Sequence, residues 1–229
     1  MTCPCCQPYH SITMPTALLN GLNFYYRVDG DGPRTFLFFN GAGLTTESWQ
    51  DIATSLAKTG RLVRFDARGC GQTETPSVPF TMEDMAEDAL SLIDRLDIPQ
   101  VIVVGHAFGG RIAQIFTHDY PERVRALVLC GTGGKYPPLT RDLDAKAADP
   151  NIDDAARIEL FFARWFGPQF RRKHPERAEG VLREMYGGTG QQAPALAPRR
   201  PPQITSAESY WAKVPASIPV LLIYGHNCR

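Results

Sequence analysis

The stretch VIVVGHAFGG constrains the fold more than any other part of the chain. Val101–Val104 is a continuous β-branched run, which predicts a strand buried on both faces of a sheet. Phe108–His118 then has helical spacing, and Gly105 and Gly109 flank the turn between the two elements. A buried strand that enters a helix through such a turn is a setting for an exposed catalytic serine. Here the middle residue is Ala107, whose methyl group cannot act as a nucleophile.

Strand and helix patterns alternate along most of the chain. The predicted strands are apolar runs at 22–28, 35–39, 61–65, 101–104, 124–129 and 218–224. Helical patterns lie between several of them, at 47–58, 81–96 and 108–118. This alternation predicts an α/β fold, with a mostly parallel sheet and helices on both faces. Ligands of such sheets bind beyond the carboxyl ends of the strands, where Asn40, Gly105 and Cys130 are expected to lie.

The same patterns divide the chain into three parts. Residues 14–132 and 216–229 make up the predicted α/β core. Residues 133–215 show no comparable strand but contain helical patterns at 152–166 and 177–186, so we expect an inserted helical cap. Residues 1–13 are expected to be a disordered tail. This tail contains side chains of the kind that bind zinc, on Cys3, Cys5, Cys6 and His10. Their spacing, however, matches no common zinc unit.

Composition narrows the classes of partner and the compartment. Lys and Arg total 24 and Asp and Glu total 24, which argues against a nucleic-acid-binding or anionic-membrane surface. No apolar run reaches the length of a transmembrane helix, and no apolar signal-peptide core follows the first methionine. We therefore expect the six cysteines to be reduced thiols in the cytoplasm. The sequence shows no cofactor motif and does not indicate an oligomeric state.

Four short motifs, each at the end of a predicted strand, occur in a characteristic order. They are Asn40-Gly41-Ala42-Gly43, Asp66-Ala67-Arg68-Gly69-Cys70-Gly71, Gly105-His106-Ala107-Phe108-Gly109-Gly110 and the segment 218–225. Together they resemble the α/β-hydrolase family, of the kind with a helical lid. The resemblance covers nearly the whole chain from Leu18 onward. It implies hydrolysis of small esters, lactones or related acyl compounds, and therefore an apolar ligand that contains a carbonyl group.

The resemblance also implies how such a ligand would be held. The backbone N–H groups of Ala42 and Phe108 match the family's oxyanion hole, which stabilises negative charge on a reacting carbonyl oxygen. Further ligand contacts are expected on the neighbouring loops and in the aromatic-rich cap. These candidates are Asn40, Gly41, His106, Cys130, Trp165 and Phe166.

The chain departs from the family pattern at every member of the catalytic triad. The family's nucleophile falls on Ala107, its acid falls on Asn227, and the position of its histidine comes later than Arg229. We therefore expect a protein that is catalytically silent as written and truncated at its C-terminus relative to the family. The alternatives are a non-catalytic binding or signalling protein, or a scaffold with neither activity. Cys130 is the one candidate for a replacement nucleophile, but a small buried cysteine is the commoner explanation, and no base is visible for it.

Overall fold

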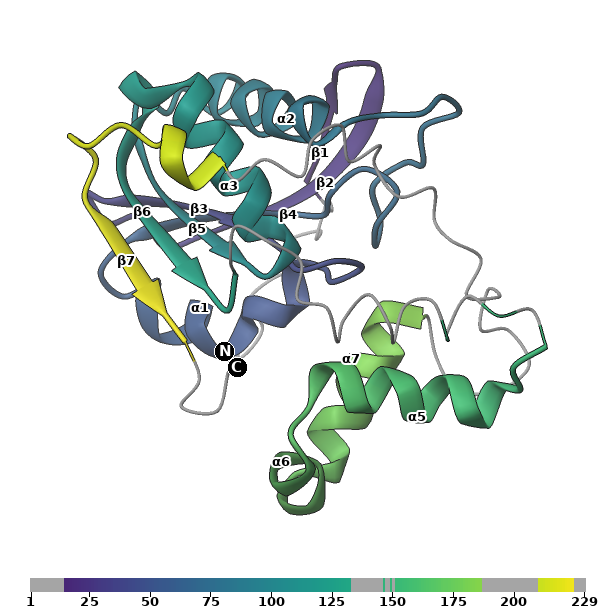
Figure 1. Cartoon of the computed structure of the whole chain (residues 1–229). Coiled ribbons are helices and arrows are strands. Elements are labelled where there is room, and N and C mark those ends of the chain that lie inside the picture. The colour runs from purple at the N-terminus through teal and green to yellow at the C-terminus, as the bar shows by residue number, and fades with distance from the viewer. Residues whose placement is uncertain (1–14, 133–145, 147–148, 150, 187–209, 225–229) are drawn as a thin grey trace, which may run out of the picture.

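The computed structural model describes residues 15–132, 146, 149, 151–186 and 210–224 (Figure 1). Its seven strands form one sheet in the order β1-β2-β4-β3-β5-β6-β7. The strands are β1 Thr16–Leu19, β2 Leu22–Asp29, β3 Thr35–Phe39, β4 Arg61–Phe65, β5 Val101–His106, β6 Val124–Cys130 and β7 Val220–Ile223. Strands β4, β3, β5, β6 and β7 run parallel, which confirms the mostly parallel sheet. Two antiparallel pairs, β1 with β2 and β2 with β4, extend the sheet at the edge opposite β7.

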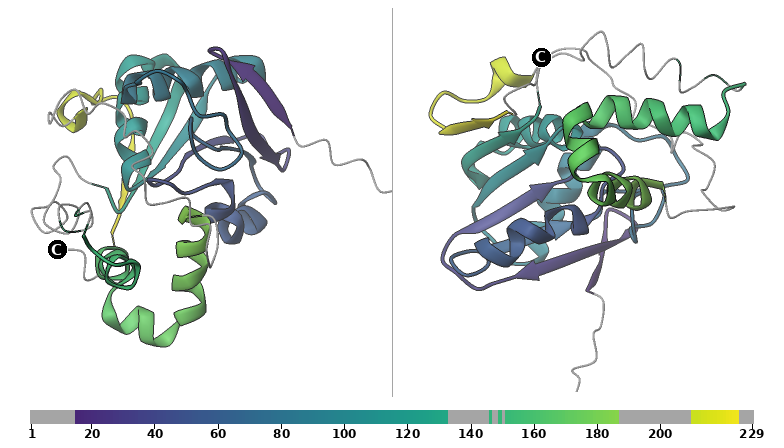
Figure 2. Two further views of the ribbon diagram at one scale, coloured as in Figure 1. Left: turned by 90° about the vertical axis from the view of Figure 1, so that its right-hand side faces the viewer. Right: turned by 90° about the horizontal axis from the view of Figure 1, so that it is seen from below.

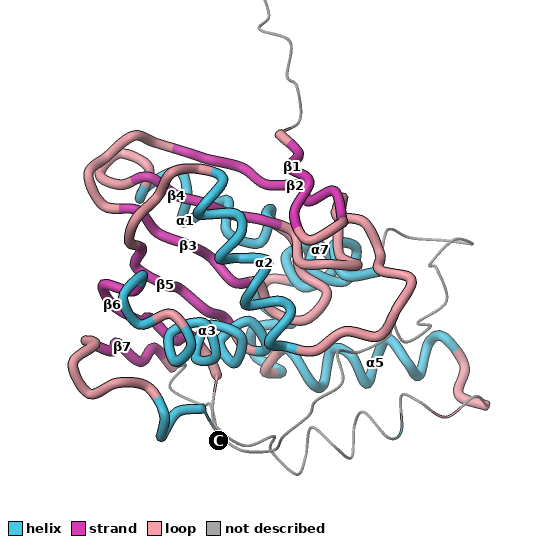
Figure 3. Tube along the Cα trace, turned by 90° about the horizontal axis from the view of Figure 1, so that it is seen from above, coloured by secondary structure: helices cyan, strands magenta, loops and turns pink. Residues whose placement is uncertain are grey.

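Helices cover both faces of the sheet, as the alternating pattern predicts. Figures 1 and 3 show α2 (Met82–Arg95) and α3 (Phe108–Asp119) on one face and α1 (Gln50–Leu56) on the other. Successive residues of β3 divide between two apolar clusters, because side chains alternate across a strand. Leu37 and Phe39 join the cluster under α2 and α3, whereas Phe38 joins the cluster under α1. The core therefore has a layer on each side of β3.

Three further helices form a group of their own. They are α5 (Asp154–Trp165), α6 (Pro168–Lys173) and α7 (Pro175–Tyr186), and Figures 1 and 2 show them beyond the carboxyl ends of the strands. Phe162 and Ala178 pack on Leu44, in the loop after β3. Helical structure at 152–166 and 177–186 is thus confirmed, with α6 as an addition. The cap bounds of 133–215 and the tail at 1–13 fall largely or wholly outside the described residues and stay predictions.

Strand β7 lies at an edge of the described sheet and pairs with β6 alone. Leu221 is 56% exposed and Leu222 is 43% exposed, although they point to opposite faces. Strand β7 therefore gives the described sheet an exposed apolar edge. Across the part of the chain that the structure describes, we find no helix whose length and hydropathy would let it cross a bilayer.

Candidate active site

The turn between β5 and α3 holds its tip residue in a conformation that L-residues avoid. Ala107 has φ 48° and ψ −114°. Its N–H donates to the Cys130 carbonyl at 3.0 Å, and its carbonyl accepts from the Gly110 N–H at 3.1 Å. A non-glycine residue in such a region costs about 1–3 kcal/mol and persists only where its surroundings enforce it. The strained strand-to-helix turn predicted from VIVVGHAFGG is therefore formed.

Glycines flank the tip because the backbone approaches too closely for a side chain. A Cβ on Gly105 would lie 2.6 Å from the Gly110 Cα and 2.7 Å from the Ala113 Cβ. A Cβ on Gly109 would come within 3.0 Å of the carbonyl oxygens of Phe39 and Asn40. The first turn of α3 thus packs directly on the end of β3. This contact fixes where the helix begins relative to the loop after β3.

The start of α3 presents backbone N–H groups near the tip. The helix begins at Phe108, and the cap residue Ala107 makes no side-chain hydrogen bond to it. First-turn N–H groups have no acceptor within their own helix, and the helix dipole places partial positive charge there. The loop that carries Ala42 lies beside this turn, since Gly41 packs against the His106 ring. The structure therefore places both expected donor segments at the same end of the sheet.

The side chain of Asn40 is engaged by the protein at both ends. Asn40 is 7% exposed. Its Nδ2 donates to the Phe65 carbonyl at 2.8 Å, and its Oδ1 accepts from the Trp49 Nε1–H at 2.5 Å. These bonds connect the ends of β3 and β4 to the residue before α1. The sequence did not indicate this bridge, because nothing in the pattern links Asn40 to Trp49.

His106 and Cys130 face each other in the register of β5 and β6. The His106 ring meets Trp49 edge-on, with ring centroids 6.2 Å apart. Burial lowers the pKa of the His106 imidazole, which favours the neutral form of the ring. Burial raises the pKa of the Cys130 thiol, which keeps it protonated and weakly nucleophilic. The Cys130 environment therefore does not activate it as a replacement nucleophile.

Two cap residues were predicted to contact a ligand, Trp165 and Phe166, and the structure describes the side chain of Phe166 alone. Phe166 stacks on Phe170 with ring centroids 5.5 Å apart. Phe162, 6% exposed, packs on Leu44 of the loop after β3, and the partly buried Phe166 packs against the same cluster. The side chain of Trp165 and the whole of Asn227 lie outside the described residues.

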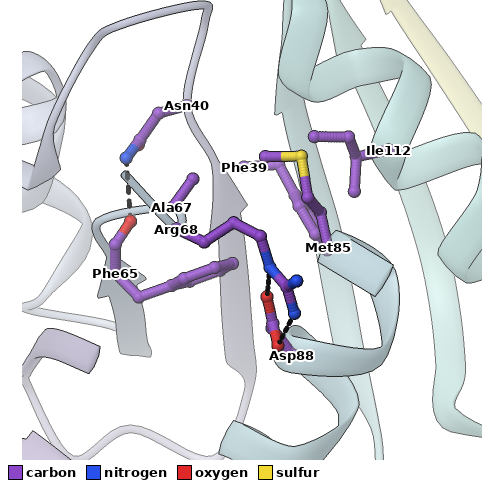
Figure 4. A pocket seen from close by; sticks show the side chains of 8 residues that line it. All are labelled: Phe39, Asn40, Phe65, Ala67, Arg68, Met85, Asp88 and Ile112. Carbon is purple, nitrogen blue, oxygen red and sulfur yellow. Dashed lines mark hydrogen bonds and ion pairs between the residues drawn. The ribbon is translucent and has the colours of Figure 1, made fainter. Parts of the chain in front are cut away.

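A small cavity is lined by residues of β3, β4, α2 and α3 and of the loops that follow β3 and β4. Figure 4 shows these residues. The cavity measures about 10 Å³, roughly the space of one water molecule. Arg68 and Asp88 form a bidentate ion pair in its wall, with both N···O distances at 2.7 Å. The cavity is too small for an organic ligand.

Among the described residues, no group of three or more His, Cys, Asp or Glu side chains could hold a metal, and Cys3, Cys5, Cys6 and His10 lie outside them.

Replacing Ala107 with glycine is expected to stabilise the protein. Glycine adopts positive φ freely, so relief of about 1–3 kcal/mol of strain outweighs the roughly 0.5–1 kcal/mol that glycine loses in chain entropy. The midpoint of urea unfolding should therefore rise. The matched control is Ala163→Gly on the exposed face of α5, where glycine should cost about 1 kcal/mol. An unchanged or lower midpoint for Ala107→Gly would show that the tip is not strained.

Comparison with known proteins identifies the relatives of this chain. The alpha/beta hydrolase fold family matches residues 34–224. A 2-hydroxymuconate semialdehyde hydrolase from Pseudomonas sp. (strain CF600) is 34% identical over 134 residues, which are 57% of this chain and 47% of that protein. A 3-oxoadipate enol-lactonase from Acinetobacter baylyi is 26% identical over 80% of this chain and 68% of its own length. The chain spans about half the length of the first of these curated relatives.

Solved structures agree with the sequence comparison. The enol-lactonase from Burkholderia xenovorans LB400 superposes with a TM-score of 0.74 at 25% identity, over 93% of this chain and 81% of its own. The family match alone covers well over half of the sequence, and it includes β3, the strained turn at Ala107 and β7. The chain therefore belongs to the α/β hydrolase fold family.

Proposed function

We propose that this chain belongs to a lineage of hydrolases of small esters, lactones or related acyl compounds, and that its site is catalytically silent. The observation that carries the proposal is Ala107 at the tip of the strained turn. Acyl transfer through a covalent intermediate needs a nucleophile at that tip, and a methyl group supplies none. The relatives named as an enol-lactonase and a semialdehyde hydrolase support the substrate class, since both names describe carbonyl compounds.

A second function, binding without turnover, is favoured by what the turn retains. The α3 N-terminus has no side-chain cap, so the Phe108 N–H is positioned to donate to a ligand oxygen. The Ala42 N–H would be the second donor, by its place in the adjacent loop. Two such donors polarise a carbonyl group without any covalent step. The ligand proposed is a small apolar molecule with one carbonyl oxygen, enclosed from above by the cap aromatics.

We propose the partner and the compartment that the composition predicts, a small-molecule partner and the cytoplasm. The equal numbers of acidic and basic residues support a small-molecule partner rather than nucleic acid or a membrane surface. Cys130 is a free thiol, which supports a cytoplasmic location.

The test combines a turnover assay with a binding assay on the purified chain. Hydrolysis of p-nitrophenyl butyrate should not exceed the rate without protein, whereas δ-valerolactone should bind saturably in calorimetry and be recovered intact. Ala107→Leu should weaken that binding by about tenfold or more, because the longer side chain fills the tip. Ala163→Leu on exposed α5 is the control and should bind as the wild type does.

Each alternative gives a different result in this test. Turnover that Cys130→Ser abolishes would contradict catalytic silence and make Cys130 the nucleophile. Binding that Ala107→Leu leaves unchanged would place the ligand away from the turn. Absence of both turnover and binding would leave a silent scaffold and contradict the second function.

A further inference from the structure

The two proposed donor groups lie on separate segments of the chain. Phe108 is held by the packing of α3 on β3, where Gly109 leaves no room for movement. Ala42 instead lies in the glycine-flanked loop after β3, and Gly43 has φ +72°. Glycine-rich loops adopt many conformations unless contacts restrict them. One oxygen atom can accept from both N–H groups only if something fixes the loop relative to the turn.

The Asn40 side chain fixes the start of this loop. It donates to the Phe65 carbonyl at 2.8 Å and accepts from the Trp49 Nε1–H at 2.5 Å. Both partners lie on structured elements, since Phe65 ends β4 and Trp49 precedes α1. Trp49 is itself 6% exposed and packs on Phe38 with ring centroids 4.9 Å apart. The two bonds therefore connect the loop to the rigid core.

The His106 ring forms the contact between the loop and the turn. His106 directly precedes Ala107 in sequence, and its ring stands edge-on to Trp49 at 6.2 Å. A Cβ on Gly41 would lie 2.9 Å from the His106 Nδ1, so the ring lies directly against the Gly41 backbone. Trp49 thus contacts both Asn40 and His106. The three side chains form one continuous cluster from β4 to the turn.

We infer that Asn40, Trp49 and His106 are positioning residues, which set the spacing between the Ala42 and Phe108 N–H groups and do not contact the ligand themselves. The inference rests on the binding function proposed above. It replaces the expectation that Asn40 and His106 contact the ligand directly. The polar atoms of Asn40 are already bonded within the protein, and the His106 ring is covered by Gly41 and Trp49.

The test separates the hydrogen bond from general stability of the cluster. Trp49→Phe keeps an aromatic ring beside His106 and Phe38 but removes the N–H that Asn40 accepts from. The control, Leu62→Val, removes one methylene group from the same apolar cluster and leaves that bond in place. Both variants are measured well below their unfolding midpoints, so that only folded protein is compared.

The expected result is a selective loss of affinity. The Kd for δ-valerolactone should rise by about tenfold in Trp49→Phe and stay within about twofold of the wild type in Leu62→Val. Equal changes in the two variants, or wild-type affinity in Trp49→Phe, would overturn the positioning role.

A readout without ligand keeps this inference distinct from the proposed binding. If the wild type does not bind the lactone, the binding function has failed, and the amide resonance of Ala42 decides the positioning role. That resonance should shift and broaden in Trp49→Phe but not in Leu62→Val, because only the first variant frees the loop. The same spectrum for Ala42 in both variants would overturn the inference.

Discussion

Replacing Gly109 with alanine should destabilise the core by about 3 kcal/mol or more, one of the two largest effects expected in this protein. The new Cβ would come within 3.0 Å of the carbonyl oxygens of Phe39 and Asn40. Both are backbone atoms at the end of β3, where Phe39 pairs with Gly105 of β5. They cannot move aside without disturbing the central pair of strands. Urea unfolding followed by tryptophan fluorescence measures the loss.

Gly180→Ala is the control for this substitution. Gly180 lies inside α7, and a Cβ there would have no atom within 4 Å. Alanine is favoured over glycine in a helix by about 1 kcal/mol, so this variant should be slightly more stable than the wild type. If Gly109→Ala unfolds at the same urea concentration as the wild type, the close packing of α3 on β3 is wrong.

Replacing Asp29 with alanine should cost about 3–5 kcal/mol, because it leaves a buried charge without its partner. Arg64, the second-to-last residue of β4, is 0% exposed. Its Nε and Nη2 donate to Asp29 Oδ2 at 2.9 and 2.5 Å, and its Nη1 donates to the Thr46 carbonyl at 2.8 Å. Without Asp29, the guanidinium keeps only neutral acceptors inside the core. The free energy of unfolding measures the effect.

Two comparisons make the Asp29 result specific. The double variant Asp29→Ala with Arg64→Met removes both charges and should recover much of the lost stability, since apolar replacement of a buried pair is often neutral. Asp51→Ala breaks an exposed pair, Arg177 with Asp51 at 2.6 Å, and should cost less than about 1 kcal/mol. Equal costs for Asp29→Ala and Asp51→Ala would contradict the importance of burial for the Arg64 pair.

The parts of the fold that follow local rules could be predicted from the sequence. The glycines around Ala107 indicated the strained turn, because few other backbones require that spacing. The helix predicted at 81–96 is present as α2, and Thr81 and Asp84 form a complete reciprocal cap at its start. The hairpin of β1 and β2 was not predicted, although Asn20-Gly21 is a strong hairpin signal and both residues have positive φ.

The contacts that hold the site together could not be predicted in this way. Asn40 and Trp49 are nine residues apart, and Asp29 and Arg64 are 35 apart. Such pairs can be identified only when the strand order and register are known. The antiparallel pairing of β2 with β4 has no local signature in the sequence. Arg64 falls in the strand predicted at 61–65, and the sequence pattern predicted no charged partner for it. The identity of its partner required the structure.

The central proposal is that this chain keeps the donor groups of a hydrolase site but lacks the nucleophile. The most direct measurement is an amide NMR titration with δ-valerolactone, with the lactone analysed afterwards. The account predicts that the Phe108 and Ala42 resonances move together along one saturable curve and that the lactone is recovered unchanged. Saturable binding that leaves both resonances in place, or conversion of the lactone to its hydroxy acid, would contradict it.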